Sequence, residues 1–178
     1  MNLKTNKSVI LLDADVLIHF SKGDSIYRLK KIYPKYEKWV LDAVKMEVKY
    51  GKARSELDFS ILEGFIILKK FPPTNSPEYL EYAKIKRAKF TIGEGEAHCL
   101  AYLRFNNHIL ASSNLSDIQK YCEAYDITYL TTMDLLCEAL RSGEMDEEGC
   151  DNFIQKVFTD NGKLPCQFIS QYIDRTFL

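Results

Sequence analysis

Short apolar runs alternate with longer amphipathic stretches along this chain, and the alternation predicts its elements. Residues 9–12 are expected to form a buried strand, because four apolar residues stand together and the carboxylates of Asp13 and Asp15 follow at once. Four further strands are expected in "WVL" (residues 39–41), "EGFIILKKF" (63–71), "HILASS" (108–113) and "ITYL" (127–130). Segments with helical spacing separate the strands, and this order predicts a parallel sheet that helices cover on both faces.

Residues that start and stop helices mark several boundaries. Asp42 is expected to cap a helix that continues through "AVKMEVKYGKA", residues 43–53. Pro77 stands where the first turn of a helix tolerates proline, so a helix is expected from there to Phe90. Further helices are expected after the first strand and within residues 91–107, 115–125 and 131–144. The tail from Met145 is expected to form two more helices, separated by "DNGKLP" (residues 160–165).

Length and composition are those of a soluble globular protein. The chain has 178 residues, of which 46% are hydrophobic and 28% charged, and this size predicts a single domain over residues 1–178. The formal net charge is -1, which excludes a chain that is basic throughout. An anionic partner would therefore have to be attracted by a local patch or by a bound cation.

The N-terminus and the cysteines predict the compartment. Only a short apolar run, interrupted by carboxylates, stands near the N-terminus, so neither a signal peptide nor a membrane span is expected. A cytoplasmic location and no membrane partner follow by default. The five cysteines are widely spaced and are expected to be buried thiols in a reducing compartment: Cys99, Cys122, Cys137, Cys150 and Cys166.

Acidic residues stand beside the predicted strands, near the edge where the carboxyl ends of a parallel sheet meet. Ligands bind outside this edge, so the acids are candidates for a functional site. They are Asp13 and Asp15 after the first strand, Glu47 in the helix after the second, Glu94 and Glu96 at the start of a helix, and Asp117 after the fourth strand. Carboxylates brought together repel one another unless protons or a cation neutralise them, and oxygen ligands suit Mg²⁺ or Mn²⁺. The chemistry predicted is hydrolysis of phosphoryl esters.

Five segments resemble, in order, the motifs of the PIN-domain nucleases, a family that includes the VapC-type toxins of bacterial toxin–antitoxin pairs. They are "LLDADVLIHF", "VKMEV", "GEGEAHCLA", "ILASSNLSDI" and "DITYLTTMDLLCEALRSGEM", and they run from about Ser8 to Met145. The resemblance implies a three-layer α/β/α sandwich with a central, mostly parallel five-stranded sheet. It places the core at about residues 8–145 and leaves residues 146–178 as a C-terminal helical extension.

The same resemblance implies a site and an activity: a metal-dependent endoribonuclease that uses Mg²⁺ or Mn²⁺ to hydrolyse RNA. Many members carry a fourth Asp where this chain has Asn114, so Asp117, three residues on, is expected to replace it. The expected metal ligands and catalytic acids are then Asp13, Glu47, Glu96 and Asp117. The residues expected to support them are Asp15, Ser112 and Asn114. Asp15 is expected to cap the helix or to support the site by hydrogen bonding, rather than to bind the metal. RNA, an antitoxin protein and a second copy of the chain are the partners that the resemblance implies.

Two other functions stay open on the sequence alone. One is a catalytically impaired PIN-like module that binds RNA or a protein partner, because Asn114 stands in place of an acid. The other is a haloacid-dehalogenase-type phosphatase, whose opening D-x-D motif resembles Asp13 to Asp15, although Leu17 stands where that motif has Thr or Val. Two lysine-rich stretches, residues 28–38 and 84–89, are either RNA contacts or solvated faces.

Overall fold

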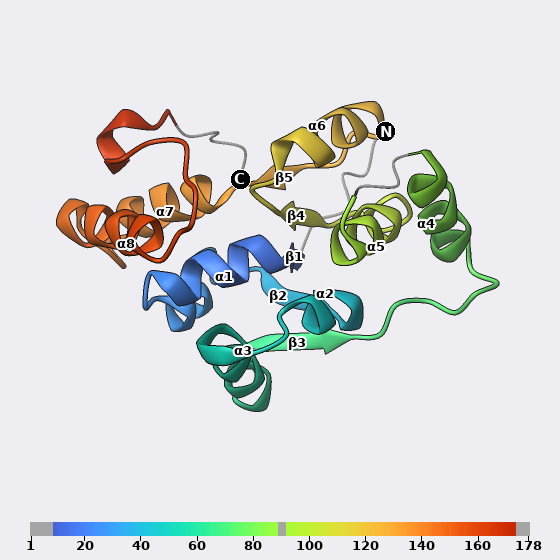
Figure 1. Cartoon of the computed structure of the whole chain (residues 1–178), viewed down its shortest axis with the longest axis horizontal. Coiled ribbons are helices and arrows are strands. Elements are labelled where there is room, and N and C mark those ends of the chain that lie inside the picture. Colours follow the sequence, from blue (N-terminus) through green and yellow to red (C-terminus); the bar gives the residue numbers. More distant parts are fainter. Residues whose placement is uncertain (1–8, 89–91, 174–178) are drawn as a thin grey trace.

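The structure, a computed structural model, describes residues 9–88 and 92–173 of the chain. Its centre is a five-stranded sheet in the order β3-β2-β1-β4-β5, in which every neighbouring pair of strands is parallel (Figure 1). The strands are β1 (Val9–Leu12), β2 (Glu37–Leu41), β3 (Ile66–Lys69), β4 (Ile109–Ala111) and β5 (Tyr129–Leu130). All five expected strands are confirmed, and the sheet is wholly rather than mostly parallel.

Helices cover both faces of the sheet, which confirms the expected α/β sandwich. The described residues form α1 (Ala14–Lys22), α2 (Asp42–Glu47), α3 (Gly51–Leu62), α4 (Pro77–Ala88), α5 (Glu94–Leu103), α6 (Leu115–Ala124), α7 (Thr132–Arg141) and α8 (Glu147–Thr159), with short 3₁₀ helices at Ile26–Lys30 (η1) and Ile169–Gln171 (η2). In Figure 1, α4 and α5 pack together on the right of the sheet, while α1, α7 and α8 pack together on the left. Within the described parts of the chain, no helix has the length and apolar character needed to cross a membrane.

The helix expected from Asp42 through residue 53 is interrupted, which corrects the sequence prediction. Helix α2 ends at Glu47, because Val48 has a ψ of 77° and the chain leaves the helical region there. Gly51, with a φ of 75°, then starts α3 in a new direction. Asp42 is the first residue of α2 rather than its cap. The break produces a corner at residues 48–50, and Glu47 stands at its edge.

The C-terminal tail is also less helical than expected. Helix α8 is present, but the described tail beyond residues 160–165 forms only η2 instead of a second α-helix. Tertiary contacts hold this segment: the N–H of Ile169 donates to Asp151 (2.8 Å), and the hydroxyl of Tyr172 donates to Asp134 (2.9 Å). Packing against α7 and α8 therefore decides its path. The expected end of the α4 helix at Phe90 lies outside the described residues.

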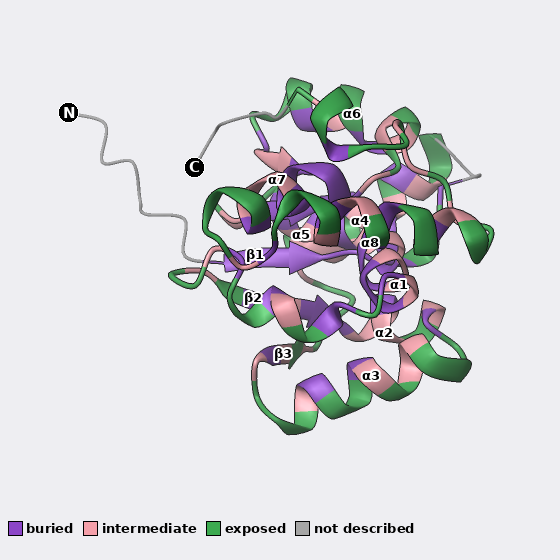
Figure 2. Ribbon diagram, turned by 90° about the vertical axis from the view of Figure 1, so that its left-hand side faces the viewer, coloured by how far each residue is buried: buried purple, intermediate pink, exposed green. Residues whose placement is uncertain are grey.

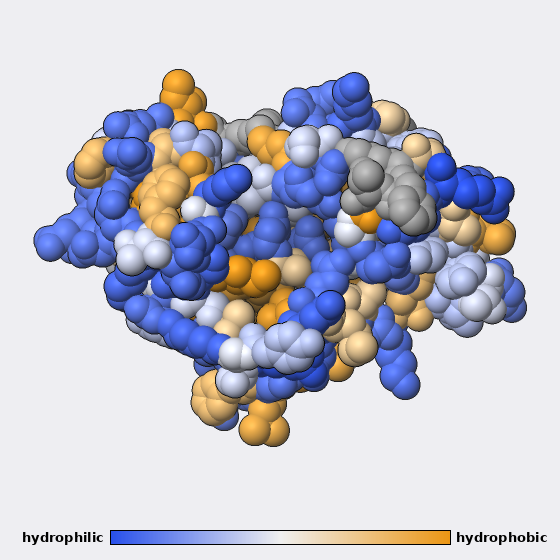
Figure 3. All heavy atoms as spheres, viewed as in Figure 1, coloured by the Kyte–Doolittle hydropathy of each residue, from blue (hydrophilic) through white to orange (hydrophobic). Residues whose placement is uncertain are grey.

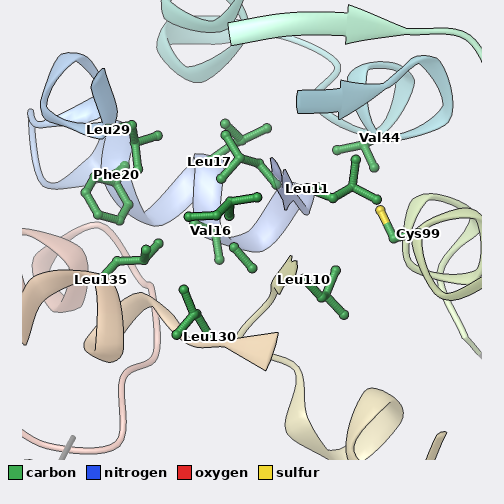
Figure 4. Packing of buried hydrophobic residues seen from close by; sticks show 14 of the residues in the cluster. Leu11, Val16, Leu17, Phe20, Leu29, Val44, Cys99, Leu110, Leu130 and Leu135 are labelled. Atoms are coloured by element: carbon green, nitrogen blue, oxygen red, sulfur yellow. The ribbon is translucent and has the colours of Figure 1, made fainter. Parts of the chain in front are cut away.

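The core forms where β1 meets the helices on both sides. Figure 2 shows β1 buried along its length, and each of its four residues is at most 2% exposed. Figure 4 shows Leu11 of β1 close to Val44 of α2 and Cys99 of α5. Because β1 is central and buried, the residue that follows it is delivered to the middle of the sheet's carboxyl edge.

Candidate acidic site

Asp13 stands at the carboxyl end of β1 and also caps α1. Its backbone N–H donates to the carbonyl oxygen of Ala111 in β4 (2.9 Å), which extends the pairing of these strands by one residue. Its Oδ1 accepts a hydrogen bond from the N–H of Ala14 (2.8 Å), and the residue is only 4% exposed. The strand pairing and the cap together fix this carboxyl group in one place.

The surroundings of Asp13 make its carboxyl group difficult to ionise. Burial is the largest cause, and with the charge of Asp15 it raises the pKa of Asp13 to about 8. The charge of Glu47 adds to this effect. Hydrogen bonds from the Ala14 N–H and the Ser112 hydroxyl act in the opposite direction. Asp13 therefore exchanges a proton near neutral pH rather than near the ordinary value of 3.8.

Asp15 is held by backbone groups and by a chain of hydroxyls that reaches α7. Its Oδ2 accepts from the N–H of Ser113 (2.7 Å), whose Oγ lies 2.8 Å from the hydroxyl of Thr132. The same hydroxyl lies 2.9 Å from Nδ1 of His19. Burial raises the pKa of Asp15 to about 6 and lowers that of His19 to about 4, so the imidazole is neutral at pH 7. The expectation that Asp15 caps the helix was wrong, because Asp13 is the cap of α1 and Asp15 lies in its first turn. The hydrogen bonds of Asp15 are of the kind that a supporting residue would make.

Glu47 reaches the site from the end of α2 because a glycine makes room for it. Its Oε1 accepts a hydrogen bond from the N–H of Gly95 in the first turn of α5 (2.8 Å). A Cβ atom on Gly95 would lie 2.7 Å from Oε2 of Glu47 and 3.1 Å from Cα of Val44. The second glycine of "GEGE" is therefore needed for the close approach of α2 to α5, a role that the sequence analysis did not identify.

Asn114 joins the two remaining acids. Its Nδ2 donates to Asp117 (2.7 Å) and lies 3.3 Å from Oε2 of Glu96. Glu96 is buried, at 5% exposure, whereas Asn114 is exposed at the start of α6. Asp117 is thus linked to Glu96 through an amide that stands between their carboxylates.

The charges of four of the acids act on one buried thiol. Cys99 of α5 is fully buried, and burial raises its pKa well above the ordinary value. The charges of Asp13, Glu96, Glu47 and Asp15 raise it further, in that order. These acids come from three separate segments of the chain, and each is near enough to Cys99 for its charge to act on the thiol. Cys99 is therefore a buried neighbour of these acids, which the sequence analysis did not identify.

Other residues considered from the sequence lie elsewhere. Glu94 pairs with Lys86 (2.9 Å) and accepts a hydrogen bond from the hydroxyl of Tyr82 (2.5 Å), so it belongs to the α4–α5 surface. Lys38 is buried at the amino end of β2, where its ammonium group donates to the carbonyl oxygen of Tyr33 (2.6 Å). It therefore stands at the opposite end of the sheet from the acids. None of the five cysteines, all described, forms a disulfide.

The chemistry of the donor set fits a hard divalent cation. Asp13, Glu47 and Glu96 are acids at one sheet edge. The pKa of Asp13 is raised by burial and by the charges of Asp15 and Glu47, and a bound cation would offset those charges. Because Gly95 has no side chain, the carboxylate of Glu47 can lie against the first turn of α5, next to Glu96. Within residues 9–88 and 92–173, however, no three His, Cys, Asp or Glu side chains are already gathered at ligand spacing. The acids thus have suitable ligand atoms and would have to draw closer to share one ion.

Comparison with known proteins gives one similarity of fold. The chain resembles a chain in the crystal structure of FitAcB from Neisseria gonorrhoeae, with a TM-score of 0.46 and 15% sequence identity. The matched region covers 70% of this chain and 98% of that chain. No known family matches the sequence, and no curated protein matches it.

Proposed function

We propose that this protein is a divalent-metal-dependent endoribonuclease, with Asp13, Glu47 and Glu96 as its principal acids and Asp117 as a fourth. The observation that carries the proposal is that Asp13 follows β1 at the carboxyl edge of the sheet, while Glu47 in α2 accepts a hydrogen bond from Gly95 in α5, next to Glu96. Their order in the chain is that of the PIN-domain motifs that the sequence resembles. RNA as substrate, Mg²⁺ or Mn²⁺ as cofactor, and an antitoxin protein as partner follow from that resemblance.

Hydrolysis of a phosphodiester consumes one water, which must lose a proton, and releases a ribose oxygen, which must gain one. In the protein without metal, burial raises the pKa of both Asp13 and Asp15, so carboxyl groups at the site can carry protons closer to neutral pH than free ones do. Asp13, Glu47 and Glu96 would hold the cation. When bound, Mg²⁺ or Mn²⁺ would lower the pKa of water and offset negative charge on the phosphate oxygens. The Ser113–Thr132–His19 network keeps the Asp15 carboxylate in position.

Cleavage of labelled RNA by the purified full chain tests this proposal. The wild type is expected to cut single-stranded RNA with Mn²⁺ or Mg²⁺ and not with EDTA. Asp13→Asn, which keeps the Oδ1 that caps α1, is expected to lower the rate at least 100-fold. Equal cutting by the wild type and this variant would refute the proposal, because the activity would then belong to a contaminant or to another site.

A non-catalytic RNA- or protein-binding module is the second candidate, and Asn114 favours it. Its Nδ2 directs N–H groups at Glu96 and Asp117, whereas a cation requires acceptor atoms in that space. Asn114→Asp restores an acid there. An inactive wild type that becomes a nuclease with this one substitution would establish the impaired module.

A further inference from the structure

A hollow adjoins the acidic site and shares Glu47 with it. Its volume is about 520 Å³, and its walls are formed by α1, the corner between α2 and α3, the first turn of α3, and the end of α8. Figure 3 shows hydrophobic residues gathered within a hollow near the centre of this face, over α1, with hydrophilic residues around it. The C-terminal helix α8, outside the core that the sequence predicted, therefore contributes to a surface next to the acids.

The lining of the hollow has an apolar floor and an aromatic rim. Ile18 and Ala53 are partly buried and Val48 is buried, and all three line the cavity. Tyr50, at the corner between α2 and α3, is 85% exposed and also lines it. An exposed tyrosine beside an apolar floor offers a face on which a flat ring can stack.

The rim carries three acids, Asp24, Glu47 and Asp160, and a larger number of lysines. The lysines come from α1, the corner, α3 and α8, and are Lys22, Lys49, Lys52 and Lys156. The carboxylate of Asp24 binds Lys52 and also Lys156 (2.7 Å), which holds the ends of α3 and α8 together. Both ammonium-bearing side chains remain about half exposed, at 52% and 53%. Lys49 is exposed and forms no ion pair with the described residues.

Helix α1 connects the acids to the lysines along one face. Asp15, Ile18 and Lys22 are three and four residues apart, so their side chains lie on the same side of the helix. The rise from Asp15 to Lys22 is about 10 Å. This length suits a strand that has one phosphate at the acids and the next nucleotide in the hollow.

We propose that the hollow binds one unstacked nucleotide of a single-stranded RNA, next to the phosphate at the acidic site. The base lies on the floor of Ile18 and Val48 and stacks on Tyr50, and the lysines neutralise the flanking phosphates. This inference rests on the proposed function, from which it takes RNA as the substrate, and it adds that the RNA is single-stranded. A base inside a duplex is paired and stacked, so it cannot enter the hollow.

Binding of fluorescein-labelled decauridylate to the full chain in EDTA, followed by anisotropy, tests the proposal without cleavage. Tyr50→Ala is expected to weaken binding about tenfold, because base stacking is lost. Lys49→Gln and Lys156→Gln are each expected to weaken it about threefold and to reduce the salt dependence by about one phosphate contact. A duplex of the same length is expected to bind at least tenfold more weakly than the single strand.

Two matched variants separate the hollow from general effects. Tyr50→Phe keeps the ring and is expected to bind within twofold of the wild type. Lys35 lies two residues before β2, at the opposite end of the sheet from the acids, so we interpret it as part of a solvated face rather than an RNA contact. Lys35→Gln removes the same charge and is expected to bind within twofold as well. Unchanged binding in Tyr50→Ala and Lys49→Gln, or equal binding of duplex and single strand, would overturn the proposal.

Parallel cleavage assays keep this proposal distinct from the proposed function. If the wild type cuts RNA with Mn²⁺ but the Tyr50 and Lys49 variants bind RNA as the wild type does, the proposed nuclease activity is supported. The proposed role of the hollow is then refuted. RNA that binds through these residues but is not cut supports the hollow and refutes the nuclease. A wild type that binds no RNA refutes both.

Discussion

Asp13 shows how one carboxyl group acquires several properties from its position. It follows a buried strand, caps α1 and stands beside Asp15 and Glu47, and its pKa is raised to about 8. Of these properties, the position after a strand was visible in the sequence. The extent of burial and the closeness of Glu47 depend on segments distant in the chain, so only the fold could reveal them.

The raised pKa of Asp13 predicts a dependence of stability on pH. Between the ordinary value of 3.8 and the folded-state value of about 8, the folded protein binds more protons than the unfolded chain. The wild type without metal therefore loses stability as the pH rises through this window. The asparagine of Asp13→Asn does not ionise, so this variant does not lose stability in this window. Its Tm is expected to exceed that of the wild type by almost nothing at pH 4 and by about 2–6 °C at pH 8.

Thermal unfolding in EDTA at several pH values measures this effect. Glu63→Gln, which changes an exposed carboxyl group after α3, serves as the control and is expected to shift Tm equally at all pH values. A constant difference between Asp13→Asn and the wild type from pH 4 to pH 8 would show that Asp13 ionises as an ordinary surface acid does.

The contact of α2 with α5 depends on features that the sequence pattern did not resolve. "VKMEV" and "GEGEAHCLA" predicted Glu47 and Glu96 as site residues, but not that Glu47 would lie over Gly95. The glycine itself was a signal of this close contact. Glycine within a helix costs about 1 kcal/mol relative to alanine, so its presence at position 95 indicates that a side chain would not fit there. The break at Val48 was missed because the residues on both sides of it have helical spacing.

Gly95→Ala tests this packing. The added methyl group would meet Oε2 of Glu47 and the backbone of Val44, so α2 has to move away from α5. The unfolding free energy is expected to fall by about 1–3 kcal/mol, and RNA cleavage by more than tenfold. Denaturant unfolding and initial cleavage rates measure the two effects.

A double-mutant cycle shows whether the effect passes through Glu47. In a Glu47→Ala background the carboxylate is absent, so Gly95→Ala is expected to cost at least about 0.5 kcal/mol less. Equal costs in the two backgrounds would mean that the contact between the glycine and the carboxylate contributes nothing.

The molecule as a whole includes the C-terminal extension in its core. The rings of Phe153 in α8 and Phe20 in α1 pack edge to face, with their centroids 5.1 Å apart, and both are at most 1% exposed. The sheet and its order of elements followed from apolar runs and from the resemblance to PIN-domain nucleases. The tail was predicted less well, because contacts with α7 and α8 rather than local helix preference fix its path.

Phe153→Ala tests whether residues 1–178 behave as one domain. The large cavity left between α1 and α8 is expected to lower the unfolding free energy by about 3–5 kcal/mol, with a single transition. Phe168→Ala, which truncates an exposed ring in the same extension, is the control and is expected to cost less than about 0.5 kcal/mol. Two separate transitions, or a small loss in Phe153→Ala, would show that the extension unfolds independently.

Anomalous diffraction from crystals of the full chain soaked in Mn²⁺ tests the central claim most directly. The expected result is a peak at the carboxyl edge of the sheet, with oxygens of Asp13, Glu47 and Glu96 about 2 Å from it, and no such peak in Asp13→Asn. A fully soaked crystal with no peak near Asp13, or with its only peaks far from these three acids, would contradict the claim that they form a metal site.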